Sequence, residues 1–194
     1  MTTRENPDII QLTNPGEADP VVRQELTACW IAVTNAGGAA GFPFPPVDSS
    51  QVRPAVDALA SCLDPGRSRI LLARVGGTLA GWVGLSRDPS PLIAHWGVVS
   101  HLQTQLARRN EGIGSALMHR LREVARDEMG LEQLHLAVRG GTGLEDFYSR
   151  LGWRVTGRWP GKLRLAPDDT RDEILMILTP LWPSGTPGEL ATLK

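Results

Sequence analysis

In RRNEGIGSAL, residues 108–117, two arginines and a polar pair precede two glycines and a return to apolar residues. Glycine loses more backbone entropy on folding than other residues, so this pair indicates a chain that bends sharply or is approached closely. The free N–H groups and the dipole at a helix start favour an anion. The stretch is thus a candidate phosphate loop, with Arg109 or Arg108 adding charge, provided that Glu111 points away. A turn that the chain path alone requires would also explain the glycines.

The elements on either side of this stretch form a strand, helix, strand unit. An apolar strand is expected over 92–105, and LEQLHLAV (131–138) alternates as a second strand does. The helix between them has one apolar stripe, made of Ile113, Leu117, Leu121 and Val124. Two strands joined by one helix over so short a distance should be parallel, with a right-handed crossover.

Hydrophobic periodicity and turn signals place the other elements. Strands are expected at 8–13, 68–74, 78–85, near 153–159 and near 173–179, and helices at 20–35, 52–63 and 142–151. Gly76 and Gly77 indicate a hairpin turn. TGLE (142–145) matches a capping box, in which Glu145 would reach back to the helix start. The acidic APDDTRDE (166–173) is expected to be a solvated loop, although it could also attract an ammonium group.

Composition narrows the class of protein. The 194 residues fit one domain over 8–181, with a loose N-terminus (1–7) and a loose tail (182–194). A net charge of −1 gives no general field for nucleic acid or an anionic membrane. No apolar run resembles a signal peptide or a membrane span, and two cysteines offer no disulfide framework. A cytoplasmic location is the expectation.

Two other phosphate loops do not fit this chain. A dinucleotide fingerprint needs a third glycine at position 117, which is leucine here. The nearest approach to a Walker loop, GRWPGK (157–162), is one residue short and lacks the Ser or Thr. A fold that binds another nucleotide by a different loop stays open as a hypothesis.

The segment Arg109–Gly114 resembles the R-x-x-G-x-G loop of the GCN5-related N-acetyltransferase (GNAT) superfamily, which binds the pyrophosphate of acetyl-coenzyme A (acetyl-CoA). Leu102 and Thr104 occupy the alternate apolar positions before that loop, and EDFYSRLGW (145–153) is similar to the family's F-Y-x-x-x-G-F. The order of elements is similar from about residue 8 to 180. The resemblance implies an α+β (α/β) fold: a mixed, mostly antiparallel sheet of six to seven strands, four helices, and a parallel strand pair that splays at the cofactor cleft.

The resemblance also implies acetyl-CoA as the co-substrate, with no metal. Main-chain N–H groups near Gln103 or Thr104 would polarise the thioester carbonyl. Gly141 stands where the family often has Asn. The residues implied for binding the cofactor are Leu102, Gln103, Thr104, Arg109, Asn110, Glu111, Gly112, Ile113, Gly114, Ser115, Gly141 and Phe147.

Tyr148 falls at the family's general-acid position, where its phenol would protonate the departing thiolate. The alternative is a Phe-Tyr pair that packs on the apolar face of a short helix. For the base, residues 92–105 contain no carboxylate, but they do contain His95 and His101. Both are odd-numbered and, without a bulge, share a face with Gln103. His101 is a candidate base or relay, and the alternatives are a structural histidine or water that leads to solvent.

Phe42 and Phe44 lie in a Pro-rich link between the first two helices, which in this family overhangs the acceptor. They could line an acceptor pocket, or they could cap the core beneath a long loop. The leading hypothesis is an N-acetyltransferase that acts on the primary amine of a small molecule in a ternary complex. A protein or peptide acceptor and a non-catalytic acetyl-CoA-binding module are the alternatives. Members of the family are frequently dimers, so a homodimer is a further expectation.

Overall fold

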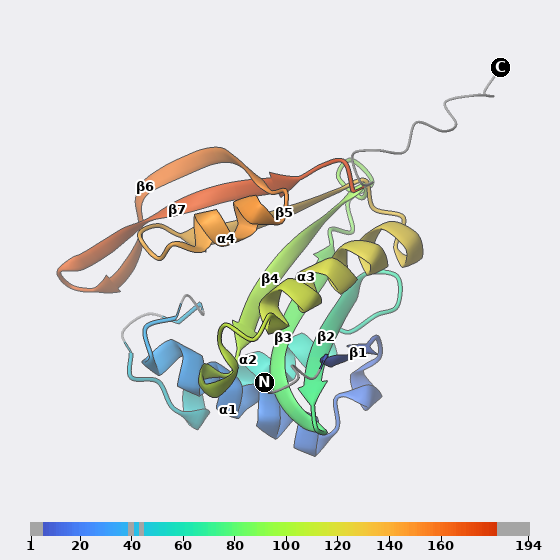
Figure 1. Cartoon of the computed structure of the whole chain (residues 1–194), viewed down its shortest axis with the longest axis horizontal. Coiled ribbons are helices and arrows are strands. Elements are labelled where there is room, and N and C mark those ends of the chain that lie inside the picture. Colours follow the sequence, from blue (N-terminus) through green and yellow to red (C-terminus); the bar gives the residue numbers. More distant parts are fainter. Residues whose placement is uncertain (1–5, 39–40, 43–44, 182–194) are drawn as a thin grey trace, which may run out of the picture.

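A computed structural model describes residues 6–38, 41–42 and 45–181 of the chain. One sheet runs through it, with seven strands in the order β1-β2-β3-β4-β5-β7-β6 (Figure 1). The strands are β1 (Asp8–Leu12), β2 (Ser68–Val75), β3 (Thr78–Arg87), β4 (Trp96–Thr104), β5 (Gln133–Arg139), β6 (Arg154–Ala166) and β7 (Asp169–Leu178). All neighbours are antiparallel except β4 and β5, which are parallel. The mixed, mostly antiparallel sheet and its parallel pair are thereby confirmed.

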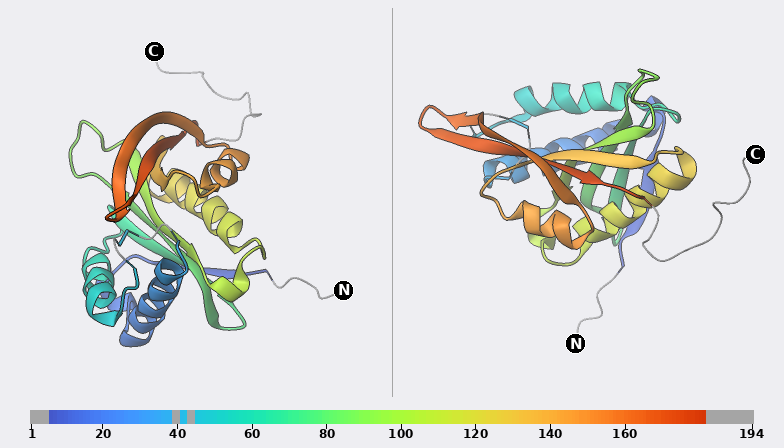
Figure 2. Two further views of the ribbon diagram at one scale, coloured as in Figure 1. Left: turned by 90° about the vertical axis from the view of Figure 1, so that its left-hand side faces the viewer. Right: turned by 90° about the horizontal axis from the view of Figure 1, so that it is seen from above.

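Two helices cover each face of the sheet (Figure 2). On one face lie α1 (Pro20–Asn35) and α2 (Ser49–Ser61); on the other lie α3 (Ile113–Glu123) and α4 (Leu144–Arg150), with a π-helical turn after α3. The start of α1 is set by its cap, because Asp19 accepts a hydrogen bond from the main-chain N–H of Val22 at 2.8 Å. No helix of the described residues is long and apolar enough to span a bilayer.

The core has two parts, one under each pair of helices. Alternate residues of β2 supply both: Leu71 and Ala73 belong to the α3 side, Ile70 and Leu72 to the α1 side. This alternation explains why Ile70 to Ala73 are all apolar, since both faces of β2 are buried there. The predicted stripe of α3 is also buried, with Leu117, Leu121 and Val124 fully inaccessible; the sequence pattern therefore predicted that helix correctly.

The parallel pair separates soon after it starts. Only three residue pairs join β4 to β5, and the last of them is Val98 with His135. Beyond it, β5 stays paired with β7 as far as Arg139 opposite Glu173, while β4 bends away at a bulge where His101 has φ 57°. Figure 1 shows the two strands diverging toward the side where α4 and the end of α1 lie. The splay implied by the family resemblance is present.

Two expectations about element bounds were wrong. The fourth strand begins at Trp96 rather than Leu92, because residues 91–95 form a turn and leave His95 outside the sheet. The acidic run 166–173 is not a loop, since only Pro167 and Asp168 connect the last two strands. Its charged residues belong to a hairpin that leaves them partly or fully exposed, and such a dense charged run looks like a loop in the sequence.

The capping box at 142–145 was also wrong. The residue that caps α4 is Gly143, with φ 73°, and no described side chain makes the capping hydrogen bond. Thr142 instead donates from Oγ1 to the carbonyl of Arg139 at 2.8 Å, and Glu145 pairs with Arg158 at 3.0 Å. The residues expected to be loose, 1–7 and 182–194, lie outside the described residues except for 6 and 7.

Candidate functional site

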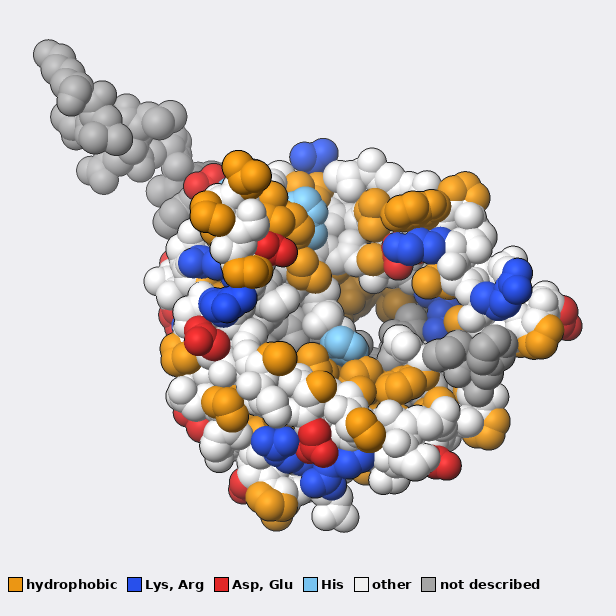
Figure 3. All heavy atoms as spheres, turned by 180° about the vertical axis from the view of Figure 1, so that it is seen from behind, with side chains coloured by type: hydrophobic (Ala, Val, Ile, Leu, Met, Phe, Trp, Pro, Cys, Tyr) orange, Lys and Arg blue, Asp and Glu red, His pale blue; other side chains and the backbone are white. Residues whose placement is uncertain are grey.

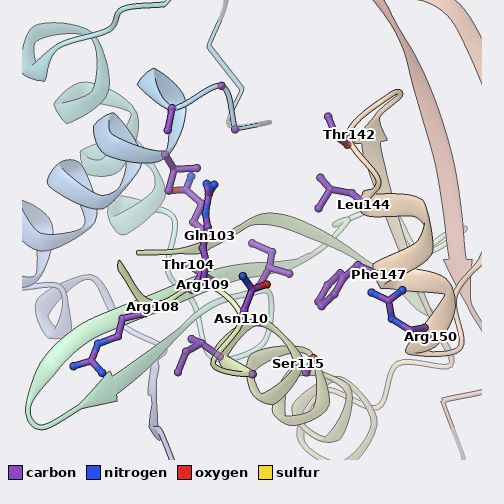
Figure 4. Close-up of a pocket in the computed structure, with 18 residues that line it drawn as sticks. Gln103, Thr104, Arg108, Arg109, Asn110, Ser115, Thr142, Leu144, Phe147 and Arg150 are labelled. Atoms are coloured by element: carbon purple, nitrogen blue, oxygen red, sulfur yellow. The ribbon is translucent and has the colours of Figure 1, made fainter. Parts of the chain in front are cut away.

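A cleft of about 700 Å³ opens where β4 and β5 part (Figure 4). In Figure 4, Gln103 and Thr104 of β4 lie on one side, and Leu144 and Phe147 of α4 lie on the other. The start of α3 forms the floor, next to Ser115. The residues that line the cleft are Val33, Ala36, Gly37, Gly38, Leu102, Gln103, Thr104, Arg108, Arg109, Asn110, Gly112, Ile113, Gly114, Ser115, Thr142, Leu144, Phe147 and Arg150.

The loop before α3 has the backbone of an anion-binding turn. Asn110 has φ 65° and Gly112 has φ 88°, so the chain curls twice before α3 starts at Ile113. No described side chain caps this helix, which leaves its first N–H groups directed at the cleft side. A Cβ on Gly112 would have no described atom within 4 Å, so its glycine is needed for the backbone angle rather than for space.

The charge of the cleft is positive, although the whole chain carries −1. Arg108, Arg109 and Arg150 line it, and the described lining contains no Asp or Glu. The phosphate loop was predicted on the condition that Glu111 points away. Its carboxylate accepts a hydrogen bond from Arg108 at 3.3 Å, and Glu111 is not part of the lining. Its carboxylate is therefore engaged outside the cleft, and the field in the cleft suits phosphate groups.

Most of the residues predicted to bind the cofactor come together here. All of them line the cleft except Glu111 and Gly141. Gly141 lies in the link between β5 and α4 with φ 77°, and a Cβ there would meet Nη1 of Arg171 at 3.4 Å. Gly114 sits between the two walls, since its Cβ would meet Phe147 at 3.4 Å and Thr104 at 3.7 Å.

Polar groups without partners face this opening. From Val99 to Thr104 no described strand pairs with β4 on the side of β5, so main-chain groups along that edge are free to bind a ligand. The side chain of Gln103 is 2% exposed, and neither Oε1 nor Nε2 has a hydrogen-bond partner among the described residues. Buried amides are normally paired, so a ligand or water is expected to complete these bonds.

Tyr148 is placed behind the wall of the cleft rather than in it. Its ring packs edge-on against Phe147 at 5.0 Å and Trp153 at 5.9 Å, and only 6% of the residue is exposed. Burial raises the pKa of the phenol, which keeps it protonated at neutral pH. Phe147 separates it from the cleft lining, and the hydroxyl is available as an acid only if a ligand reaches past that ring.

His101 lies on the α1 side of the sheet, in an aromatic cluster. Its ring is 4.6 Å from Trp30 and stacks on Trp82 at 5.7 Å with an 8° angle. Burial lowers its pKa, so the imidazole is neutral, and Nδ1 has no partner among the described residues. His101 shares a face of the sheet with Gln103, whose partner on β3 is Trp82. The bulge in β4 is what turns the side chain of His101 to that face.

Phe42 packs on the core, as one of the two expectations had it, and whether it also lines an acceptor pocket stays a prediction. It packs on Trp30 at 5.2 Å as part of the core, and it also lines a second cavity of about 280 Å³ beside Arg139. Phe44 lies outside the described residues.

Sequence reasoning missed the segment that follows α1 (Ala36 to Gly38) and Arg150, because only the folded chain brings these segments to the cleft. Among the described residues no group of His, Cys, Asp or Glu could hold a metal ion.

This sheet, splayed beside a glycine-rich helix start, defines an acetyltransferase fold. The family model described as the acetyltransferase (GNAT) family matches residues 24–153, two thirds of the chain. The chain belongs to the GNAT family and is an acyltransferase by that membership. A search of curated proteins gives no significant match.

Solved structures agree on the fold. An acetyltransferase of the GNAT family from Streptococcus pneumoniae is 20% identical with a TM-score of 0.68, over 89% of this chain and 99% of that chain. The putative acetyltransferase yncA from Salmonella typhimurium, solved with acetyl-CoA, is 17% identical with a TM-score of 0.68, over 95% and 99%. An aminoglycoside 6′-N-acetyltransferase complexed with coenzyme A is 16% identical with a TM-score of 0.67, over 91% and 98%. At these identities the likeness establishes the fold alone.

Proposed function

We propose that this protein transfers an acetyl group from acetyl-CoA to the primary amine of a small molecule. The observation that carries the proposal is the unpaired edge of β4 after Val98, which opens onto a cleft lined by arginines. Acetyl-CoA carries a diphosphate, which suits the arginines, and an arm with amide groups, which suits the unpaired edge of β4. The amides would complete the free main-chain groups of the strand, and the phosphates would meet the start of α3.

The residues of the loop would hold the diphosphate through main-chain N–H groups. The curled backbone from Asn110 to Gly114 leads these groups to the cleft, and Arg109 adds a charge that no described carboxylate pairs. Since the helix dipole adds to hydrogen bonding, the start of α3 is suited to an anion without a metal ion.

The residues of β4 would orient the acyl group. A main-chain N–H near Gln103 or Thr104 is proposed to polarise the carbonyl, a contribution of about 3 kcal/mol in comparable oxyanion sites. The amide of Gln103 is buried beside this point with its bonds unmade, so it is a further donor and acceptor for polar groups in the cleft.

Proton transfer is assigned to two groups of opposite character. Tyr148 is proposed as the acid for the leaving sulfur, since burial keeps its phenol protonated. His101 is proposed as the base or relay that receives the amine proton through water, since burial keeps its imidazole neutral and Nδ1 free. The two residues pack on opposite sides of the sheet, Tyr148 in the core under α3 and His101 against Trp30 and Trp82.

Direct attack of the amine in a ternary complex is preferred to a covalent acyl-enzyme. Cys29 is fully buried, and burial raises the pKa of its thiol to about 12, so it holds no thiolate at neutral pH. Cys62 is exposed at the end of α2 and does not line the cleft. No cysteine is therefore placed to carry the acetyl group.

The test is calorimetric titration with coenzyme A, followed by release of free thiol from acetyl-CoA with small amines and with peptides. Binding together with thiol release by small amines is the expected result. Binding without release by any acceptor would identify a non-catalytic module, and release by peptides alone would identify a protein acceptor. The absence of binding would remove the proposal.

A further inference from the structure

The cavity of about 280 Å³ lies on the other side of the splay from the loop of α3. It is bounded by the end of β5, by β6 with the middle of β7, and by the segment at residues 41–42. Figure 3 shows this face from behind, hollowed between the two halves of the molecule, with basic side-chain atoms at the margin of the hollow. The residues that line the cavity are Gly41, Phe42, Ala137, Val138, Arg139, Leu163, Arg164, Leu165 and Glu173.

Arg139 is the unusual member of this lining. Its cross-strand neighbour is Glu173, yet the two side chains are not paired, and no carboxylate of the described residues lies within ion-pair distance of Arg139. Among the described residues its side chain makes one hydrogen bond, a long one from Nη1 to the carbonyl of Gly37 at 3.4 Å, and its Nε is buried without a partner there. Burial lowers the pKa of Arg139, as does the charge of Arg171 nearby. The charge of Asp169 acts in the opposite direction, but its carboxylate forms an ion pair with Arg171. Arg139 is therefore a half-buried cation with no anion of its own within ion-pair distance among the described residues.

The other charges of the cavity do not supply that anion. Glu173 is the one carboxylate in the described lining, and it forms an ion pair with Lys162, which also lies over the ring of Trp159 at 4.4 Å. Arg164 adds a second positive charge and has no ion-pair partner among the described residues. The cavity therefore has an excess of positive charge, which would repel an acceptor that carries only an ammonium group.

Arg139 also marks where the cavity meets the cleft. Gly37, to which it donates, lines the cleft of the proposed cofactor, whereas Arg139 lines the cavity. An anionic group held by Arg139 is thus close to the boundary between the two spaces. The rest of the cavity is apolar, formed by Phe42, Leu163 and Leu165.

We propose that the acceptor carries a carboxylate on the carbon next to its amine, as an amino acid with an apolar side chain does, and that Arg139 binds this carboxylate. The inference rests on the proposed function and names the substrate class for it. In the transfer the amine nitrogen forms a bond to the thioester carbonyl carbon and the C–S bond breaks. One proton leaves the nitrogen and one is taken up by the sulfur, so no other reactant is needed.

The experiment compares three amino acids with the amines that lack only the carboxylate: L-leucine with isopentylamine, L-methionine with 3-(methylthio)propylamine, and L-phenylalanine with phenethylamine. Thiol release from acetyl-CoA gives kcat/KM for each. The expected ratio within each pair is about 10- to 150-fold in favour of the amino acid, the range for one hydrogen bond between charged groups. In Arg139→Met the ratio should fall to about one, mainly through KM. Equal rates within the pairs for the unaltered protein would overturn the inference.

Two controls separate this inference from other causes. Arg154→Gln removes an exposed arginine of β6 that lines neither space, and it should keep the ratio of the unaltered protein. If Arg139 only ties β5 to the end of α1, Arg139→Met would lower the rates of both members of a pair equally, and the carboxylate role would be lost.

A binding experiment gives a readout apart from turnover: N-acetyl-L-leucine should bind the coenzyme A-loaded protein and N-isopentylacetamide should not. Turnover of simple amines without any preference would sink this inference alone, whereas failure to bind coenzyme A would sink the proposed function.

Discussion

Val98 of β4 lies opposite His135 of β5, and this pair is the last one that joins the two parallel strands. The opening of the cleft follows from that limit. On one side of it the strands are held together by pairing, and on the other side they form two walls of a cleft. The bulge at His101 keeps the walls apart, because it turns β4 toward α1 while β5 remains with β7.

The backbone of the α3 loop can be tested by one substitution with a matched control. Gly112→Ala should weaken coenzyme A binding by about tenfold or more, because alanine resists φ 88° and the N–H groups would turn from the cleft. Gly130→Ala is the control, since Gly130 has φ 61°, has equally open space and lies outside the cleft. Both variants should lose about 1 kcal/mol of stability. Equal binding by the two variants, measured by calorimetry, would contradict the role of the loop.

The charge of Arg109 should appear as a salt effect. Arg109→Gln is expected to weaken coenzyme A binding at low ionic strength and to reduce the dependence of Kd on salt, because a cation near phosphates is screened by ions. Arg154→Gln, which alters an exposed arginine outside the cleft, should leave that dependence unchanged. Parallel plots of Kd against salt for the unaltered protein and Arg109→Gln would show that Arg109 does not meet the phosphates.

Tyr148→Phe tests the proposed acid. The hydroxyl is removed while the ring that packs on Trp153 remains, so the fold should persist. We expect kcat to fall by about 10²–10⁴-fold, with the affinity for acetyl-CoA nearly unchanged. Steady-state kinetics and calorimetry measure the two quantities separately. Turnover equal to that of the unaltered protein would leave Tyr148 as a packing residue.

His101 predicts a pH dependence of stability. Its pKa is lowered in the folded state, whereas in the unfolded chain it is about 6.5. Below that pH the unfolded state binds more protons, so the free energy of unfolding should be full above about pH 6.5 and should decline as the pH falls toward the folded pKa. Denaturant unfolding between pH 7.5 and 5.5 measures the slope. His101→Asn, which tolerates φ 57°, should flatten it, leaving the part due to His135, whose pKa burial also lowers.

His119→Asn is the control for that experiment, because His119 is exposed on α3. It should keep the slope of the unaltered protein. An identical slope in His101→Asn would assign the titration to another group and would remove the argument for a neutral imidazole beside the cleft.

The sequence predicted those parts of the fold that have local signals. The alternation of β5, the stripe of α3 and the Gly76-Gly77 hairpin all appear as expected, since each depends on neighbours in the chain. The loop at 109–115 was found for the same reason, because glycines at a helix start are visible in the sequence. Most of the residues that the sequence predicts to bind the cofactor do lie around one cleft, and their role in binding stays a prediction.

What the sequence could not show depends on packing between distant segments. The bulge has no local mark, because His101 adopts a left-handed backbone without being glycine. Counting odd and even positions along β4 therefore fails, since Val99 faces the α3 core while Gln103 pairs with Trp82 on the other face. The end of α1 at the cleft and the cavity beside Arg139 likewise arise only when the two halves of the sheet are placed side by side.

Because β4 and β5 pair over only three residues, the sheet leaves main-chain groups of β4 without hydrogen-bond partners among the described residues on the side of β5. On the proposed function, the pantetheine arm of the co-substrate would make the main-chain hydrogen bonds that β4 and β5 do not make with each other. The bound arm would thereby hold the two halves of the sheet together. A ligand at a hundred times its Kd adds about 2.7 kcal/mol to folding stability. Resistance of this protein to heat and to proteases would then rise and fall with the supply of acetyl-CoA.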